Sequence, residues 1–94
     1  MAEPTNPGSP VVRTVTVAFA VGLHARPAAL FVQAVQQSGL AVRLSRRDGR
    51  SADARSILAV VTLDVRQGDE VVLQADGDGA EHALDRLVEL LSNG

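Results

Sequence analysis

The pattern of apolar and polar positions first predicts a strand. From Arg13 to Val21, larger apolar residues alternate with Thr or Ala, which is the period-two pattern of a half-buried strand. The larger residues expected to share one side are Val15, Val17, Phe19 and Val21. Before this strand, Met1–Pro10 holds three prolines and shows no periodicity. We therefore expect a flexible leader over residues 1–11 and a single domain over residues 12–94.

A helix is predicted next, with Pro27 in its first turn. Proline fits there because its ring presets φ and its missing N–H would have no partner in the helix. Apolar residues then recur at spacings of three and four until about Gln37, and Gly39 supplies a stop signal. The predicted core face consists of Leu30, Phe31, Ala34 and Val35.

A hairpin of two short strands is predicted in the middle of the chain. Residues 42–45 alternate between apolar and polar side chains. Asp48 and Gly49 form a tight-turn signal, so Arg50–Ala54 is expected to pair back as a third strand.

The apolar run over residues 57–63 is ambiguous. The hydroxyl of Ser56 can cap a short helix there, but the β-branched content of the run suits a buried strand equally well. Alternation then predicts a strand over Glu70–Ala75, and helical spacing predicts a last helix from Ala80 to about Ser92. The predicted order is β-α-β-β-α-β-α. Alternating strands leave one sheet face to bury, so we expect an α+β open-faced sandwich with the helices on one side.

Composition narrows the function classes. Among 94 residues only two are aromatic and the formal net charge is −2, whereas nucleic-acid-binding domains carry aromatic platforms or a basic excess. All nine basic residues are arginine and there is no cysteine, which excludes lysine chemistry, thiolate chemistry and Cys-based zinc sites. No apolar run approaches the roughly 20 residues that cross a bilayer. We expect a cytoplasmic protein without membrane insertion, cofactor or metal.

His24 is the residue best placed for chemistry. It follows the first predicted strand and precedes a helix N-terminus, where unpaired N–H groups favour an anion. Arg26 can offer two parallel hydrogen bonds to phosphoryl oxygens, and neutral imidazole has a lone pair that can accept a phosphoryl group. Gly22 allows a sharp turn beside them. Spacing alone does not decide between an anion site and an ordinary polar loop.

Two segments carry a resemblance to a known family. The segment Gly22–Ala29 resembles the active-site signature of the histidine-containing phosphocarrier (HPr) family of the bacterial sugar phosphotransferase system. The segment Asp48–Leu58 is similar to the second signature of that family, in which a serine opens a short middle helix. The order of the elements and the length agree from about Val12 onward.

The resemblance implies a carrier rather than a turnover enzyme. His24 would be phosphorylated on Nδ1 by the phosphohistidine of enzyme I, itself charged from phosphoenolpyruvate, and would pass the group to sugar-specific IIA proteins or domains. Arg26 would hold the phosphoryl oxygens. The family topology implies a four-stranded antiparallel sheet with three helices on one face. Docking should be transient, and we expect a monomer.

The resemblance also implies roles in the middle helix. Ile57, Leu58 and Val61 match an apolar docking patch, and we expect two of the three to be exposed. Ser56 matches a serine that a dedicated kinase phosphorylates in some branches, so a serine kinase/phosphorylase and a transcription regulator are possible partners. Its role as a helix cap already explains a serine there. His82 on the last helix is expected to be solvated.

The chain also departs from the family. It has no lysines near the histidine, where Gln33, Gln36 and Ala59 stand, and Arg55 is the nearest basic candidate. Asp64 occupies a position that is often glycine. These departures leave open a paralogue that serves a nitrogen-related or dihydroxyacetone-kinase phosphorelay, and a regulatory module that binds through Ser56 phosphate.

Overall fold

The computed structural model describes residues 10–93 and contains the seven predicted elements in the predicted order. The strands are β1 (Val11–Thr16), β2 (Arg43–Arg46), β3 (Ser51–Asp53) and β4 (Glu70–Ala75); the helices are α1 (Ala25–Ser38), α2 (Ile57–Thr62) and α3 (Ala80–Ser92). Of the leader predicted over residues 1–11, residues 1–9 lie outside the described part, and Val11 already belongs to β1.

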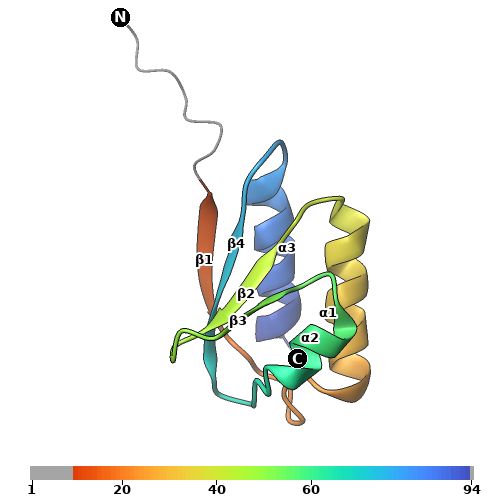
Figure 1. Ribbon diagram of the computed structural model, residues 1–94, viewed down its shortest axis with the longest axis vertical. Helices are drawn as coiled ribbons and strands as arrows, with labels where there is room; N and C mark the ends of the chain where they lie inside the picture. Colours follow the sequence, from red (N-terminus) through yellow and green to blue (C-terminus); the bar gives the residue numbers. More distant parts are fainter. Residues whose placement is uncertain (1–9, 94) are drawn as a thin grey trace, which may run out of the picture.

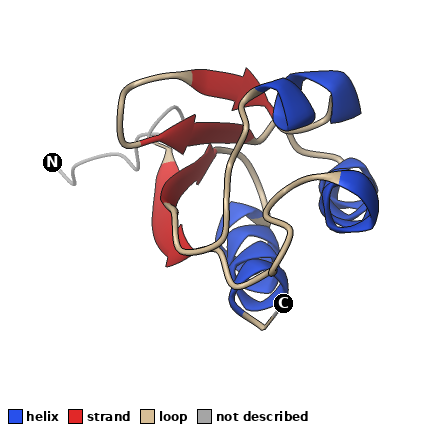
Figure 2. Ribbon diagram, turned by 90° about the horizontal axis from the view of Figure 1, so that it is seen from below, coloured by secondary structure: helices blue, strands red, loops and turns tan. Residues whose placement is uncertain are grey.

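The four strands form one antiparallel sheet in the order β1-β4-β2-β3. The inner strand β4 pairs with β1 from Val11↔Ala75 to Thr16↔Glu70, and on its other side with the second inner strand, β2. All three helices lie on one side of the sheet (Figures 1 and 2). The predicted α+β open-faced sandwich is therefore confirmed.

The core lies between the sheet and the helices. Side chains at every second position of β4, Val71, Leu73 and Ala75, are buried, while Glu70 and Gln74 are exposed and Val72 is half-buried. This is the two-residue period of a half-buried strand. On the helical side, α3 buries the stripe Ala80, Leu84, Leu87 and Leu91.

The first strand is shorter than its alternation predicts. It begins at Val11 rather than Arg13 and ends at Thr16, because its partner β4 begins at Glu70. Val17 beyond the strand end is still buried and bonded to Asp69, but Val21 in the following turn is 58% exposed and does not share the buried side with Val15. The length of β1 is set by the residue at which β4 starts. The alternation of side chains within β1 carries no information about that residue.

The predicted core face of α1 is partly wrong. Phe31 and Val35 are buried as predicted, but Leu30 is 40% exposed and Ala34 only half-buried. The buried stripe is Ala28, Phe31, Val32 and Val35. These positions have the spacing i, i+3, i+4, i+7 of a single helical face, turned by about one residue from the predicted one.

The structure resolves the ambiguous run as a helix. Ser56 has an extended backbone and its Oγ accepts a hydrogen bond from the Ala59 N–H at 3.2 Å, which is the geometry of an N-cap. The helix α2 buries Val60 against the core. The preceding hairpin is slightly shorter than predicted, since β3 spans Ser51–Asp53 and not Arg50–Ala54.

Candidate functional site

His24 is the N-cap residue of α1. Its backbone is extended, with φ −130° and ψ 164°, and its carbonyl accepts the first helical hydrogen bond from the Ala28 N–H. The imidazole does not cap the helix, and 35% of the side chain is exposed. Ala25 follows with φ 50°, a left-handed conformation that costs a residue with a Cβ about 1–2 kcal/mol. The backbone thus turns sharply between the histidine and the helix.

Two loops meet next to His24 and set its position. We call residues 17–24 the first site loop and residues 63–69 the second site loop. The Leu23 N–H donates to the Val65 carbonyl at 2.9 Å, and the side chains of both residues are fully buried. The Val17 N–H also donates to the Asp69 carbonyl. Figure 1 shows both loops at the same end of the molecule as α2 and the start of α1.

Gly22 lets the two loops approach closely. A Cβ on Gly22 would lie 2.3 Å from the Val65 carbonyl oxygen and 2.8 Å from the Arg66 Cα, and its φ of 69° is left-handed. The contact is made by backbone atoms that cannot rotate away. A glycine is therefore required for reasons of space as well as conformation.

Asp64 brings a carboxylate to the histidine. Its Oδ1 lies 3.0 Å from His24 Nε2, and its Oδ2 accepts a hydrogen bond from Arg66 at 3.0 Å. The hydrogen bond from Arg66, followed by that with His24, holds the pKa of the Asp64 carboxyl below its usual value. Nδ1 is consequently the ring nitrogen of His24 without a side-chain partner among residues 10–93.

Arg46 anchors the second site loop from the opposite side. Its guanidinium, which belongs to the end of β2, donates to the carbonyls of Leu63 and Asp64 and lies 3.4 Å from Asp69 Oδ2. These carbonyls follow the last turn of α2, where a cation is favoured by the partial negative charge of the helix end. The arginine fixes the backbone from which Asp64 reaches His24.

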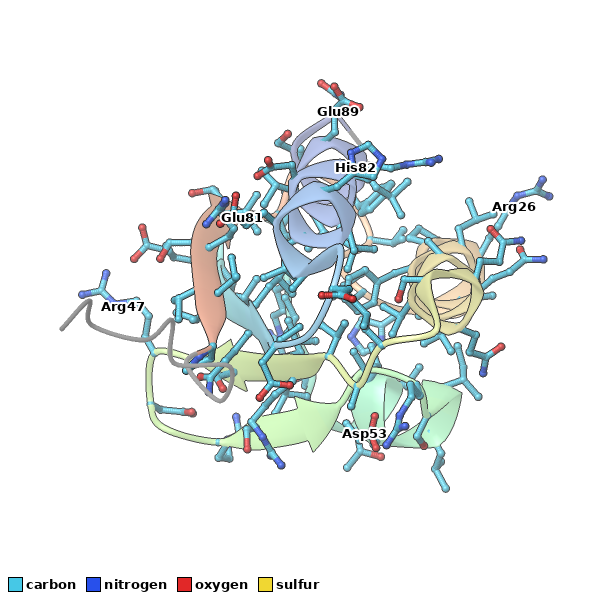
Figure 3. The ribbon with its side chains drawn as sticks, turned by 90° about the horizontal axis from the view of Figure 1, so that it is seen from above. Arg26, Arg47, Asp53, Glu81, His82 and Glu89 are labelled. Atoms are coloured by element: carbon cyan, nitrogen blue, oxygen red, sulfur yellow. The ribbon has the colours of Figure 1, made fainter. Side chains whose placement is uncertain are left out.

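Arg26 is not engaged with His24. The structure places it in the first turn of α1, exposed, with no side-chain hydrogen bond or ion pair to the described residues. Figure 3 shows its side chain extending away from the body of the molecule. Its charge is free to meet an anion brought by another molecule.

The surface of α2 lies near the start of α1. Ile57 is 44% exposed and Leu58 is 75% exposed, so two of the three patch residues are exposed as expected, while Val61 packs half-buried against the core.

Arg55 beside Ser56 is bound to Asp53 by a 2.8 Å ion pair, and its hydrogen bonds lower the pKa of Asp53 to about 2. The ion pair with Asp53 therefore partly neutralises the charge that Arg55 could offer to an acidic partner. His82 is exposed on α3, as expected (Figure 3).

Three residues around His24 carry no motif that would identify them from sequence. Arg46, Asp64 and Arg66 lie 22 to 42 positions beyond the histidine, and only the fold brings them to it. The one available signal was the position of Asp64, which departs from the glycine common in the resembled family. Its φ of 57° explains why glycine suits that position.

Known proteins are similar to this chain in sequence and in fold. A family model described as the PTS HPr component phosphorylation site matches residues 11–93. The chain belongs to the HPr family. The phosphocarrier protein HPr of Streptomyces coelicolor is 46% identical over 82 residues, covering 87% of this chain and 88% of that protein. HPr of Haloferax volcanii is 47% identical over 81 residues, covering 85% and 91% respectively.

The fold agrees with the same assignment. The crystal structure of a phosphocarrier protein HPr from Bacillus anthracis matches with a TM-score of 0.85 at 32% identity, covering 90% of this chain and 100% of that one. As an HPr-family member, the chain is a phosphocarrier of the phosphotransferase system that works through a phosphohistidine. Within residues 10–93 no helix is long and apolar enough to span a membrane, and no group of three metal-binding side chains gathers.

The close approach of the two site loops at Gly22 predicts how substitutions there affect stability. Gly22→Ala should lower the free energy of unfolding by about 3 kcal/mol, because it adds a backbone clash to the penalty for left-handed φ. Gly39→Ala is the matched control, since Gly39 has φ 74° but nothing within 4 Å of its added Cβ. We expect that control to lose only about 1–2 kcal/mol in urea unfolding. Equal losses in the two variants would contradict the account of the loops.

Proposed function

We propose that His24 is the phosphoryl acceptor and donor of this HPr-family protein. In this proposal Nδ1 takes the group from the phosphohistidine of enzyme I, charged from phosphoenolpyruvate, and hands it to sugar-specific IIA proteins or domains for carbohydrate uptake. One observation carries the assignment: His24 lies half-buried at the start of α1 with Nε2 on Asp64, which leaves Nδ1 without a side-chain partner among residues 10–93. His82, the other histidine, is an exposed residue with no hydrogen bond to the described part of the chain.

The surroundings of His24 suit a carrier. The N–H groups of Ala25 and Arg26 precede the first hydrogen bond of α1 and are available to a phosphoryl oxygen. The helix dipole adds typically about 0.3–1 kcal/mol for an anion, which steadies the group without trapping it. Phosphoryl transfer between two proteins needs alignment and charge stabilisation rather than a deep pocket. A half-buried ring, on a loop that is hydrogen-bonded to the second site loop, supplies that alignment.

Arg26 acts as the phosphoryl clamp in this proposal. Its guanidinium has no competing carboxylate among the described residues, whereas Arg55 and Arg66 are each paired with an aspartate. It is therefore the arginine beside His24 whose donors are free to bind the incoming oxygens. Arginine keeps its charge at all cytoplasmic pH values and binds such oxygens in pairs.

The apolar patch on α2 serves as the docking surface. Ile57 and Leu58 offer exposed apolar area next to the start of α1, and Val61 borders them. A small interface allows rapid release, as a carrier that visits two partners requires.

We propose that the protein works as a monomer in the cytoplasm. Ser56 acts as the cap of α2, and its phosphorylation by a kinase stays a prediction from the resemblance.

Phosphate uptake tests the acceptor. The intact protein, incubated with enzyme I and labelled phosphoenolpyruvate, should gain one acid-labile phosphate per chain. His24→Ala should gain none, and His82→Ala, which removes the other histidine, should gain as much as the parent. Labelling of His24→Ala at the parental level would contradict the assignment. Adding either a sugar-specific or a nitrogen-type IIA protein to the charged carrier then separates the two branches.

The clamp is tested by the rate of uptake. Arg26→Ala should slow transfer from enzyme I by about 10- to 100-fold, because a hydrogen bond to a charged group is worth about 1.5–3 kcal/mol. Arg47→Ala removes another exposed arginine, in the β2–β3 turn and on the opposite side of the molecule in Figure 3, and should leave the rate unchanged. An Arg26→Ala protein that accepts phosphate at the parental rate would remove the clamp from the mechanism.

A further inference from the structure

We propose that Asp64 is a positioning residue, which holds the His24 ring in the tautomer that accepts a phosphoryl group and stabilises the charge that the ring then gains. This inference rests on the proposed function of His24 and deepens it. It arises from an aspartate that contacts the imidazole from a loop 40 positions further along the chain.

The backbone aims the carboxylate at the ring. Asp64 has φ 57°, a left-handed conformation that aspartate tolerates better than most residues with a side chain. Arg46 holds the Leu63 and Asp64 carbonyls, so the backbone on both sides of the turn is anchored to β2. The Leu23–Val65 hydrogen bond ties the same turn to the loop that carries His24. The contact between the Asp64 carboxylate and the His24 imidazole is therefore held by hydrogen bonds of the backbone on both sides.

The two oxygens of Asp64 have separate partners. Oδ2 accepts from the Arg66 guanidinium and Oδ1 faces His24 Nε2, each at 3.0 Å. The nearby positive charge of Arg66 keeps the carboxyl ionised. An ionised carboxylate can only accept hydrogen bonds, so Nε2 carries the proton. In the neutral ring this leaves the lone pair on Nδ1, the atom that must attack phosphorus.

The same contact stabilises the product of the transfer. The Nδ1 lone pair forms the new N–P bond while the N–P bond of the donor phosphohistidine breaks and returns its electron pair to the donor ring. The proton on His24 Nε2 stays in place, so the His24 ring becomes positively charged as the donor ring becomes neutral. Asp64 then faces a cation at 3.0 Å and stabilises it. A water molecule in the place of the carboxylate would orient the ring less firmly and carry no charge.

Two substitutions separate orientation from charge. Asp64→Asn keeps a side chain that tolerates the left-handed backbone and an amide oxygen able to accept from Nε2, but it removes the charge. Asp64→Gly removes both and suits the backbone, so the protein remains folded. Asp85→Asn is the matched control, because Asp85 also accepts a short surface hydrogen bond, from Arg13 at 2.8 Å.

The experiment combines ring-nitrogen NMR with transfer kinetics. In protein labelled with ¹⁵N at histidine, at a pH where both rings are neutral, the two nitrogens of His24 should differ in shift more widely than those of the exposed His82. Asp64→Gly should move the His24 shifts to the His82 values, while Asp64→Asn retains them. Transfer from phosphorylated enzyme I should slow by about tenfold in Asp64→Gly and by a smaller factor in Asp64→Asn. Asp85→Asn should change neither measurement.

Several results would overturn the inference. His24 shifts that match those of His82 in the parent protein would mean that Asp64 selects no tautomer. Parental or faster transfer in both Asp64 variants would mean that the contact merely holds an unreactive charged ring. If the parent protein takes no phosphate on His24 at all, the proposed function fails and the transfer role of Asp64 fails with it. The nitrogen shifts would still decide the tautomer.

Discussion

The site depends on the hydrogen bond between the Leu23 N–H and the Val65 carbonyl, which joins the two site loops. It forms only because Gly22 lets the backbones meet where a Cβ would clash. Through this bond the segment that leaves β1 and the segment that enters β4 are held together beyond the ends of their strands. Because β1 and β4 pair up to Thr16 and Glu70, the sheet itself supports both loops. The position of His24, one residue after Leu23, is fixed by this junction.

A charge network is built on that junction. Arg46 secures the backbone after α2, Asp64 projects from it to His24, and Arg66 balances the second carboxylate oxygen. The network lies on the Nε2 side of the ring and leaves Nδ1 without a side-chain partner among residues 10–93. Arg26, which has no ion-pair partner within residues 10–93, lies in the first turn of the helix that His24 caps. The residue proposed to orient His24, Asp64, and the residue proposed to bind the phosphoryl group, Arg26, thus come from different elements.

Much of the fold could be predicted because apolar periodicity records burial within a segment. The bounds of β4 and α3 follow from it directly. The end of β1 and the buried face of α1 do not, since both depend on which neighbour each segment packs against. The positions of His24 and Arg26 were visible in a motif, but the contact from Asp64 joins residues 40 apart. Such a contact follows from the meeting of two loops, which no local pattern contains.

The phosphorus–nitrogen bond proposed for His24 can be observed directly by NMR. In ¹⁵N-labelled protein charged by enzyme I and phosphoenolpyruvate, a coupling between phosphorus and a ring nitrogen identifies the phosphorylated atom. A phosphorus coupled to Nδ1 of His24, with Nε2 still bearing its proton, is the predicted result. A phosphorus coupled to Nε2 of His24, or to either nitrogen of His82, would contradict the account.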